Sequence, residues 1–300
     1  MQTAKKSKYD YLFKHNIDNY VKNIIVYNKK DVWSIDQAYE LIDNEEHIIW
    51  KNLFRKVRPH AYNSSSDMFK NGLDFLCSHA NEFDSKIPNL DNISKLIMNE
   101  TGWQIKTVSG FVDEVIFFEL LANKFFPSSD IIRLSNRFYD KYKNTNVKNV
   151  LSYTPEPDIF HEIFGHAPFL LNKDYSLLLE KIGKLGCSIL SSKVLSEDLI
   201  THNLKRLQNF VWWTLEFGLV EASNSRGYEI YGAGILSSFD EIEHVVNNKA
   251  NIIEYNFEEI IMTRFDYSNL QDRYYLIDSF NTLLNDFDRN QDQFFYNELN

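Results

Sequence analysis

The chain carries two histidines five positions apart, His161 and His166, with Glu162 beside the first and Gly165 before the second. Neutral imidazole is the commonest metal ligand in proteins. Because a helix advances about 100° per residue, side chains at i and i+5 converge on one ion only if the backbone loosens near the second of them. Glycine has the conformational freedom that this requires. The spacing therefore predicts a metal site.

A zinc peptidase is the first alternative for these residues. Its signature H-E-x-x-H places the histidines at i and i+4 on one helical face, with the glutamate as general base. Here the spacing is H-E-x-x-x-H, one residue too long for that register, so a peptidase is disfavoured. The other histidines have no companion pattern and are given no role; they are His15, His47, His60, His79, His202 and His244.

Two histidines leave most of a metal's coordination sphere empty, and Glu216 is the candidate third ligand. It lies in the stretch F-V-W-W-T-L-E-F, where a buried carboxylate is costly unless it is paired or bound to a metal. The alternative is a carboxylate on a solvated helix edge, or one paired with Arg206 or a lysine, and residue types alone do not decide. Two histidines and one glutamate on one face of a metal form the facial triad of non-haem Fe(II) oxygenases.

Composition restricts the partners. The 300 residues are 44% hydrophobic and 15% aromatic, which is enough for a substantial buried core. A net charge of −10 without a Lys/Arg-rich stripe argues against nucleic acid and against an anionic membrane surface. Cys77 and Cys187 are too few for a disulfide scaffold or a cysteine-ligated metal. By elimination the partner is a small molecule.

Targeting and nucleotide-binding signals are not found. No apolar stretch follows the N-terminal lysines, and no segment approaches the length that spans a bilayer. We therefore expect a cytoplasmic protein. The sequence contains neither a phosphate loop nor G-x-G-x-x-G, so ATP and NAD are not indicated.

Periodicity predicts a mainly α fold with a small amount of β and no βαβ alternation. We expect helices at about 35–56, 67–82, 91–99, 113–125, 174–191 and 196–222, and strands near 105–109, 228–231 and 251–256. Ser34 and Gln37 are expected to form a capping box for the first helix. Pro155 and Pro157 exclude helix before Asp158, which is expected to cap a helix that carries both histidines.

Three motifs in this order resemble the pterin-dependent aromatic amino acid hydroxylases. They are P-E-P-D-x-x-H-E-x-x-G-H from Pro155, W-x-T-x-E-F-G-L from Trp212 and Y-G-A-G-I-L-S-S from Tyr231. The similarity extends from about Ile48 to Tyr275, and it looks closer to the bacterial phenylalanine hydroxylases than to the animal enzymes. It implies a single-domain catalytic fold with helices around a non-haem iron site.

The resemblance implies a cofactor set and the residues that hold it. His161, His166 and Glu216 would bind Fe(II), with tetrahydropterin as cofactor and O2 as co-substrate. Phe117 would stack on the pterin, although from the sequence pattern alone it would be assigned to a helix core. Glu162 would face the pterin rather than the metal. The full set of implied pterin contacts is Gly110, Phe111, Val112, Glu114, Phe117 and Glu162.

The resemblance also implies substrate contacts. Arg133 would hold the carboxylate of an amino acid, a role suited to a planar bidentate donor. Phe160 and Trp212 would help to wall an aromatic pocket, and a tryptophan at 212 resembles phenylalanine and tyrosine hydroxylases more than tryptophan hydroxylases. The full set of implied substrate contacts is Arg133, Thr154, Asp158, Phe160, Trp212 and Ser237.

The implied reaction is hydroxylation of the ring of a free aromatic amino acid. L-Phenylalanine is the first expectation, with oxygen added at the para carbon to give tyrosine or at the meta carbon to give m-tyrosine. Tyrosine, tryptophan or a modified aromatic amino acid are alternative substrates. From other classes, a zinc-dependent hydrolase with the same ligands and a non-catalytic binder of an aromatic metabolite remain open.

The chain also departs from the family pattern. The connection between Arg133 and Thr154 is longer than usual, so we expect a lid-like insertion at about 134–150. Residues 1–33 are expected to be an extension, 34–285 the catalytic domain and 286–300 a short polar tail. Neither the regulatory domain nor the tetramerising tail of the animal enzymes is recognised, which favours a monomer.

Overall fold

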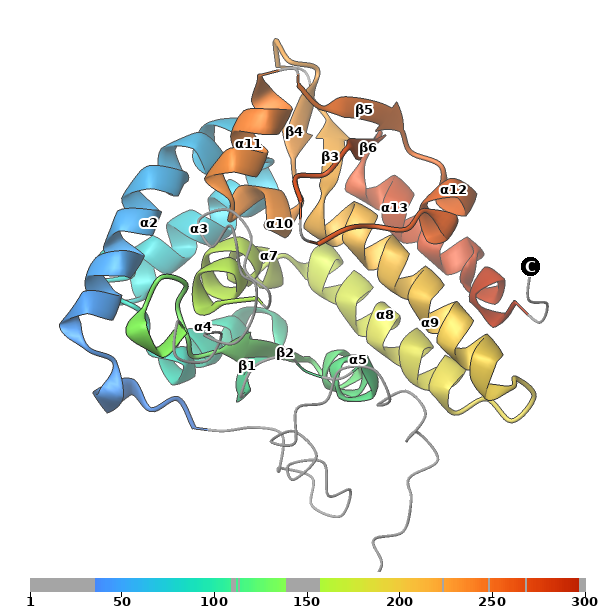
Figure 1. The fold of residues 1–300 in the computed structure, drawn as a ribbon, viewed down its shortest axis with the longest axis horizontal. Helices are drawn as coiled ribbons and strands as arrows, with labels where there is room; N and C mark the ends of the chain where they lie inside the picture. The colour runs from blue at the N-terminus through green and yellow to red at the C-terminus, as the bar shows by residue number, and fades with distance from the viewer. Residues whose placement is uncertain are drawn as a thin grey trace, which may run out of the picture.

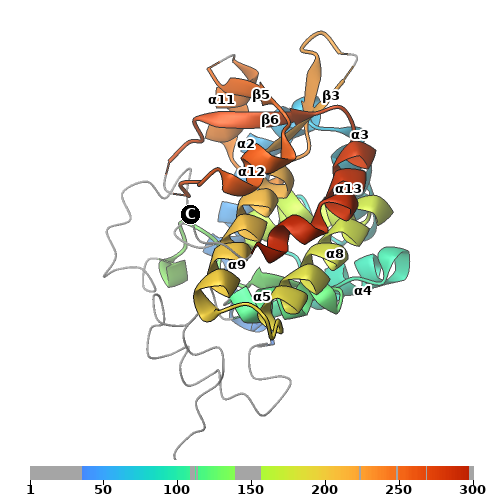
Figure 2. The same cartoon turned by 90° about the vertical axis from the view of Figure 1, so that its right-hand side faces the viewer.

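The computed structural model describes residues 36–108, 112, 114–138, 157–222, 224–247, 249–267 and 269–296. Helices make up most of this part of the chain, with one sheet of two strands and one of four. The four-stranded sheet lies at one end of the molecule, beside the long helices (Figure 1 and Figure 2). The predicted fold class, mainly α with a small amount of β, is confirmed.

The first long helix, α2 (Asn44–Ser64), begins later than predicted. The Asp43 side chain accepts a hydrogen bond from the backbone N–H of Glu46, and the Glu46 side chain accepts one from the N–H of Asp43. This capping box starts the helix at 44 because it satisfies two free N–H groups at once. Gln37, the predicted capping residue, instead bonds the backbone of Pro88 and Leu90, and Ser34 lies outside the described residues.

The remaining helices include five that were predicted, α3, α4, α5, α8 and α9, and several short ones. They are α3 (Asp67–His79), α4 (Leu90–Thr101), α5 (Glu114–Ala122), α7 (Ala167–Leu170), α8 (Lys173–Leu190), α9 (Glu197–Val211), α10 (Ala233–Leu236), α11 (Phe239–Val246), α12 (Phe257–Met262) and α13 (Phe280–Arg289). Two 3-10 helices, η1 (Tyr39–Leu41) and η4 (Gln291–Phe295), and two π-helices, η2 (His161–His166) and η3 (Trp212–Glu216), complete the set.

Both sheets contain parallel strand pairs. β1 (Gln104–Val108) pairs in parallel with β2 (Phe125–Ser129). The larger sheet has the order β4-β3-β6-β5, formed by β3 (Gly218–Glu221), β4 (Tyr228–Ile230), β5 (Asn251–Glu254) and β6 (Arg273–Ile277). β3 pairs antiparallel with β4 and parallel with β6, and β5 pairs parallel with β6.

The positions of β1, β4 and β5 were predicted, whereas β2, β3 and β6 were missed. The helix predicted for 196–222 was wrong at its end, because the chain passes from α9 through η3 into β3. The helix predicted for 113–125 likewise stops at Ala122, and the strand β2 follows. The missed strands are only four or five residues long, and their residues, such as F-F-P-S-S in β2, do not show the alternation of apolar and polar side chains that identifies a strand.

Helices α5 and α8 pack unusually closely. A Cβ atom added at Gly183 would lie 2.2 Å from the backbone nitrogen of Ala122, and one at Gly186 would lie 2.3 Å from the ring of Phe118. Only glycine allows this approach of the two backbones. The contact joins the β1–β2 side of the molecule to the pair α8 and α9, which run side by side (Figure 1).

The packed chain extends beyond the predicted end of the catalytic domain at residue 285. Helix α13 continues to Arg289, and Phe287 and Phe294 are completely buried. The segment after 285 therefore belongs to the core as far as η4, because its aromatic residues supply apolar surface that the core covers. The extension predicted for 1–33 lies outside the described residues. None of the helices in the described ranges combines the length and apolar character that a membrane crossing requires.

Candidate metal centre

Both candidate histidine ligands lie on the π-helix η2, where backbone hydrogen bonds run from i+5 to i, as from the N–H of Ala167 to the carbonyl of Glu162. This periodicity places His161 and His166 one turn apart on the same face, which an α-helix does not do. The predicted loosening of the helix is therefore a change in its hydrogen-bond register. Asp158 accepts a hydrogen bond from the N–H of His161 at 3.0 Å, the capping contact that was expected.

Gly165 serves a different purpose from the one expected. Its backbone does not adopt a positive φ. A Cβ at this position would lie 2.9 Å from the carbonyl oxygen of Ala233 and 3.2 Å from the Cβ of Ser237. The glycine is needed because η2 and α10 approach each other closely, and this contact brings Ser237 next to His161.

Glu216 ends the second π-helix, η3, and faces the two histidines. Its carboxylate oxygens lie 3.1 Å from Nε2 of His166 and 3.6 Å from Nε2 of His161, and the two Nε2 atoms are 3.2 Å apart. The alternative partner Arg206 bonds Asn203 and the backbone of Gln293 instead. Across the part of the chain that the structure describes, no other trio of His, Cys, Asp or Glu has metal-ligand spacing.

The other nitrogen of each imidazole has its own hydroxyl partner. Nδ1 of His161 lies 2.8 Å from Oγ of Ser237, and Nδ1 of His166 lies 3.4 Å from the hydroxyl of Tyr175. The Oγ of Ser237 also donates to the carbonyl of Gly234, which leaves its oxygen free to accept from an Nδ1–H. Protons on both Nδ1 atoms leave both Nε2 lone pairs facing the carboxylate.

This donor set fits a divalent metal ion. Adjacent ligands of an octahedral ion with bonds of about 2.1 Å are about 3 Å apart, close to the separations of 3.1–3.6 Å between these nitrogen and oxygen atoms. Two converging lone pairs and a carboxylate repel one another unless a cation lies between them. The set contains no sulfur and matches the composition of a facial triad.

Burial and charge set the protonation of this cluster. Burial, with smaller contributions from His166 and Arg133, lowers the pKa of His161 to about 4, against the opposing effect of Glu216. His161 is therefore neutral near pH 7 and able to donate a lone pair. Burial works against ionisation of Glu216, but the adjacent His166 and His161 keep its pKa below the ordinary value.

Arg133 and Asp158 form a buried ion pair next to η2. Nε and Nη2 of Arg133 donate to the two oxygens of Asp158 at 2.9 and 2.6 Å, and the backbone N–H of Arg133 donates at 2.8 Å. Burial opposes ionisation of Asp158, yet Arg133 and the hydrogen bonds keep its pKa below the ordinary value. Nη1 of Arg133 has no hydrogen bond within the described residues, so it retains two N–H donors for another anion.

The other predicted substrate contacts differ in how exposed their side chains are. Phe160 is completely buried and stacks on Phe164 at 4.8 Å. Its ring therefore supports Arg133, 5.7 Å away, rather than presenting a face to a substrate cavity, which differs from the prediction. Trp212 is partly exposed, stacks on Phe265 at 4.1 Å and donates from Nε1 to Gln271. Thr154 lies outside the described residues.

The family model for biopterin-dependent aromatic amino acid hydroxylases matches residues 25–295, a range that contains the whole His-His-Glu cluster. The chain belongs to this family. The suspected resemblance is thereby confirmed, and the protein is a pterin-dependent aromatic amino acid hydroxylase.

Known relatives of this hydroxylase include bacterial phenylalanine hydroxylases. It is 33% identical over 252 residues to the phenylalanine-4-hydroxylase of Caulobacter vibrioides, covering 84% of this chain and 76% of that one. The Chromobacterium violaceum enzyme is 30% identical, covering 87% and 79%. A crystal structure of the latter with iron(III) and 7,8-dihydrobiopterin superposes with a TM-score of 0.73 at 29% identity, covering 93% and 92%. Its structure with iron and phenylalanine has a TM-score of 0.72 at 28% identity, covering 93% of each chain.

The predicted pterin contacts of the hydroxylase are only partly described. Gly110 and Phe111 lie outside the described residues, whereas Val112, Glu114 and Phe117 lie within them. Phe117 is partly exposed at 5.6 Å from the ring of Phe118. Burial raises the pKa of Glu114, against a hydrogen bond from Gln208 and the charge of Lys205.

Glu162 contacts the end of β2. Its carboxyl group accepts a hydrogen bond of 2.5 Å from the backbone N–H of Ser129 at the end of β2. Burial raises its pKa well above the ordinary value, against the effect of that hydrogen bond. Glu162 thus ties η2, the helix of both histidines, to the end of β2.

Sequence reasoning missed one residue next to the cluster. Tyr175, on α8, is fully buried between Phe169 and Phe280 and reaches Nδ1 of His166. Burial and the charge of Glu216 raise the pKa of its phenol well above the ordinary value, so the hydroxyl stays neutral. Its i+9 separation from His166 across a helix boundary carries no pattern that would have identified it.

Proposed function

We propose that this hydroxylase binds Fe(II) through His161, His166 and Glu216 and adds one oxygen atom of O2 to the ring of free L-phenylalanine, at the para carbon, to give tyrosine. The observation that carries the proposal is the convergence of two imidazole Nε2 atoms and one carboxylate within 4.8 Å of one another. Membership of the family and the phenylalanine-4-hydroxylases among its relatives support the reaction.

The protein's contribution is to hold and orient the reactants. When bound, iron and tetrahydropterin together supply the electrons and the site at which O2 is activated. His161 and His166 would present neutral Nε2 lone pairs, because Ser237 and Tyr175 occupy the opposite nitrogens. The buried aromatic side chains around η2 exclude water, which strengthens the electrostatic interactions at the site.

Arg133 would bind the substrate carboxylate. Its guanidinium is fixed by Asp158 and by the ring of Phe160, so little conformational entropy is lost when a second carboxylate binds. Nη1 is the guanidinium nitrogen that remains available for the substrate carboxylate. Asp158 therefore acts on the substrate through Arg133. Trp212, whose side chain is partly exposed, would form an aromatic wall of the substrate pocket.

The pterin would lie against the segment 110–117 and Glu162, with Phe117 as its stacking partner. The partial exposure of the Phe117 ring supports this role, since a plain core residue would be covered. Meta hydroxylation, and tyrosine, tryptophan or a modified aromatic amino acid as substrate, are the alternatives. A cytoplasmic monomer with a lid over 134–150 stays a prediction.

The test is oxidation of tetrahydropterin by the Fe(II)-loaded protein with phenylalanine, tyrosine and tryptophan in parallel. Products are identified by chromatography and mass. We expect phenylalanine to give p-tyrosine in proportion to the pterin consumed. m-Tyrosine would correct the ring position, and a product from another amino acid would correct the substrate. Stoichiometric zinc without pterin-dependent O2 uptake would overturn the proposal in favour of a hydrolase.

A further inference from the structure

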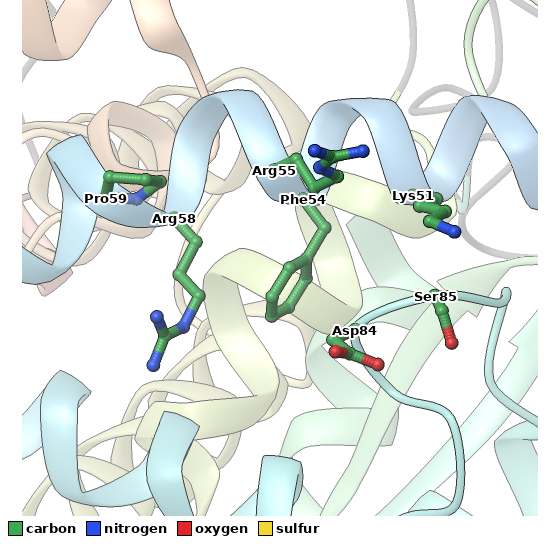
Figure 3. A pocket seen from close by; sticks show the side chains of 7 residues that line it. All are labelled: Lys51, Phe54, Arg55, Arg58, Pro59, Asp84 and Ser85. Carbon is green, nitrogen blue, oxygen red and sulfur yellow. The ribbon is translucent and has the colours of Figure 1, made fainter.

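A hollow of about 490 Å³ lies between α2 and the loop that joins α3 to α4 (Figure 3). Phe54 points from the helix toward the part of this loop that carries Asp84, whereas Arg58 extends on the other side of Phe54, where Asp74 of α3 lies 4.0 Å from its guanidinium. Its lining residues are Lys51, Phe54, Arg55, Arg58, Pro59, Asp84 and Ser85. None of them is assigned to the iron, pterin or amino acid site.

Three cationic side chains line this hollow. Lys51, Arg55 and Arg58 follow one another at i, i+4 and i+7, so they share one face of α2. Within the described ranges Lys51 and Arg55 form no ion pair, and Arg58 approaches a carboxylate only at 4.0 Å, from Asp74. Asp84 is the one acidic residue of the lining. The hollow therefore keeps an excess of positive charge on a protein whose net charge is −10.

The spacing of these cations restricts what they can bind. Lys51 and Arg58 are separated by seven residues, or about 10 Å along the helix axis, which is more than one phosphate or carboxylate spans. Guanidinium forks match the oxygens of phosphate in a bidentate manner. A volume of about 490 Å³ is that of a small-molecule site rather than of a protein interface. We propose that the hollow binds a small organic polyanion with two or more phosphate groups.

The floor of the hollow connects it to the metal-binding segment. Phe54 packs edge to face on Phe164 at 5.5 Å, and Phe164 lies between His161 and His166 in η2. Phe164 in turn stacks on Phe160, the ring beneath Arg133. A ligand that rests on Phe54 is thus one aromatic ring away from the helix that carries both histidines.

The proposal is tested by calorimetric titration of the iron-loaded full chain with sodium tripolyphosphate at low salt. We expect one site per chain and weaker binding as salt rises, because charge pairs are screened. The double variant Arg55→Ala/Arg58→Ala should weaken binding by about tenfold or more, since it removes two charge-assisted contacts. Asp84→Asn, which removes the repelling carboxylate, should tighten it, an effect that a damaged fold does not produce.

Lys56→Ala is the matched control. Lys56 is on the same helix, but its Nζ lies 4.4 Å over the ring of Phe239 of α11 and does not line the hollow. Its loss should weaken tripolyphosphate binding much less than the double variant does, because its ammonium makes no contact in the hollow and acts only through the long-range field, which salt screens. Equal loss of binding in Lys56→Ala and in the double variant would overturn the proposal, as would no binding at all. A glutamate-rich peptide that bound through Arg55 and Arg58 where tripolyphosphate did not would overturn it in favour of a protein partner.

Discussion

Nδ1 of His161 lies 2.8 Å from Oγ of Ser237. Ser237 belongs to the third sequence motif and His161 to the first, so a contact between two distant motifs fixes the orientation of the His161 ring. Ser237 was predicted to contact the amino acid substrate. Its observed partner is the candidate iron ligand, and the contact depends on the close approach of η2 to α10 at Gly165.

Ser237→Ala should therefore weaken iron binding by about 10- to 100-fold, the usual effect of losing the outer hydrogen bond of a metal-bound histidine. The Cβ that packs against Gly165 remains, so the fold should persist. Titration of the metal-free protein with Fe(II) against a competing chelator measures the change. Ser238→Ala is the control, because Ser238 caps α11 and touches no candidate ligand. Unchanged iron affinity in Ser237→Ala would contradict this account of the contact.

Arg133→Lys should raise the KM for the amino acid by about tenfold or more while kcat changes little. The reason is that a single ammonium group would replace a guanidinium that bonds both Asp158 and the substrate carboxylate. Steady-state kinetics over a range of amino acid concentrations checks this. Arg137→Lys is a suitable comparison, since Arg137 pairs with Glu46 and Asp130. A wild-type KM in Arg133→Lys would mean that another residue holds the carboxylate.

Glu241 should make stability fall as pH rises. Burial raises its pKa from 4.5 to about 7, against hydrogen bonds from Tyr274 and the backbone of Gln271. Between those pH values the unfolded chain has released a proton that the folded chain retains, so the free energy of unfolding decreases with pH, by at most about 3 kcal/mol. Glu241→Gln removes this loss. Urea unfolding at pH 5 and pH 8 should show a smaller decrease in the variant, and an equal decrease in both proteins would refute the assignment.

Gly165→Ala should displace η2 from α10. A methyl group at 165 would lie 2.9 Å from the carbonyl of Ala233, a backbone atom that cannot move alone. We expect a destabilisation of about 1–3 kcal/mol together with weaker iron binding, because the same shift separates His161 from Ser237. Chemical denaturation and iron titration measure the two effects. Wild-type values for both would show that the contact is not needed.

The chemistry of the site was easier to predict from sequence than its geometry. The types and spacing of His161 and His166 predicted a metal site, whereas residue types left Glu216 undecided and only the three ordered motifs, which resemble the family, made it the third ligand. The spacing at i and i+5 showed that an α-helix was not sufficient. It did not predict a π-helix, because the hydrogen-bond register of a helix depends on tertiary contacts such as the close approach of Gly165 to α10.

Other features depended on contacts that lie far apart in the sequence. The strands β2 and β6 could not be assigned because their partners, β1 and β3, lie many residues away and their own residues, F-F-P-S-S and R-Y-Y-L-I, do not alternate between apolar and polar. Phe160 was expected at the substrate and lies in the core, because the ring of Phe164 covers it. Tyr175 could not be predicted at all, since its contact with His166 exists only once α8 has packed.

The iron content of a Glu216→Ala variant tests the central claim most directly. Metal analysis after loading with Fe(II) and removal of free ion should give about one iron per wild-type chain and little in the variant, because two histidines alone leave most of the coordination sphere to water. Glu243→Ala, which removes a carboxylate that faces His60 and is remote from the cluster, should keep its iron. Full iron content in Glu216→Ala would contradict the assignment of His161, His166 and Glu216 as the metal centre.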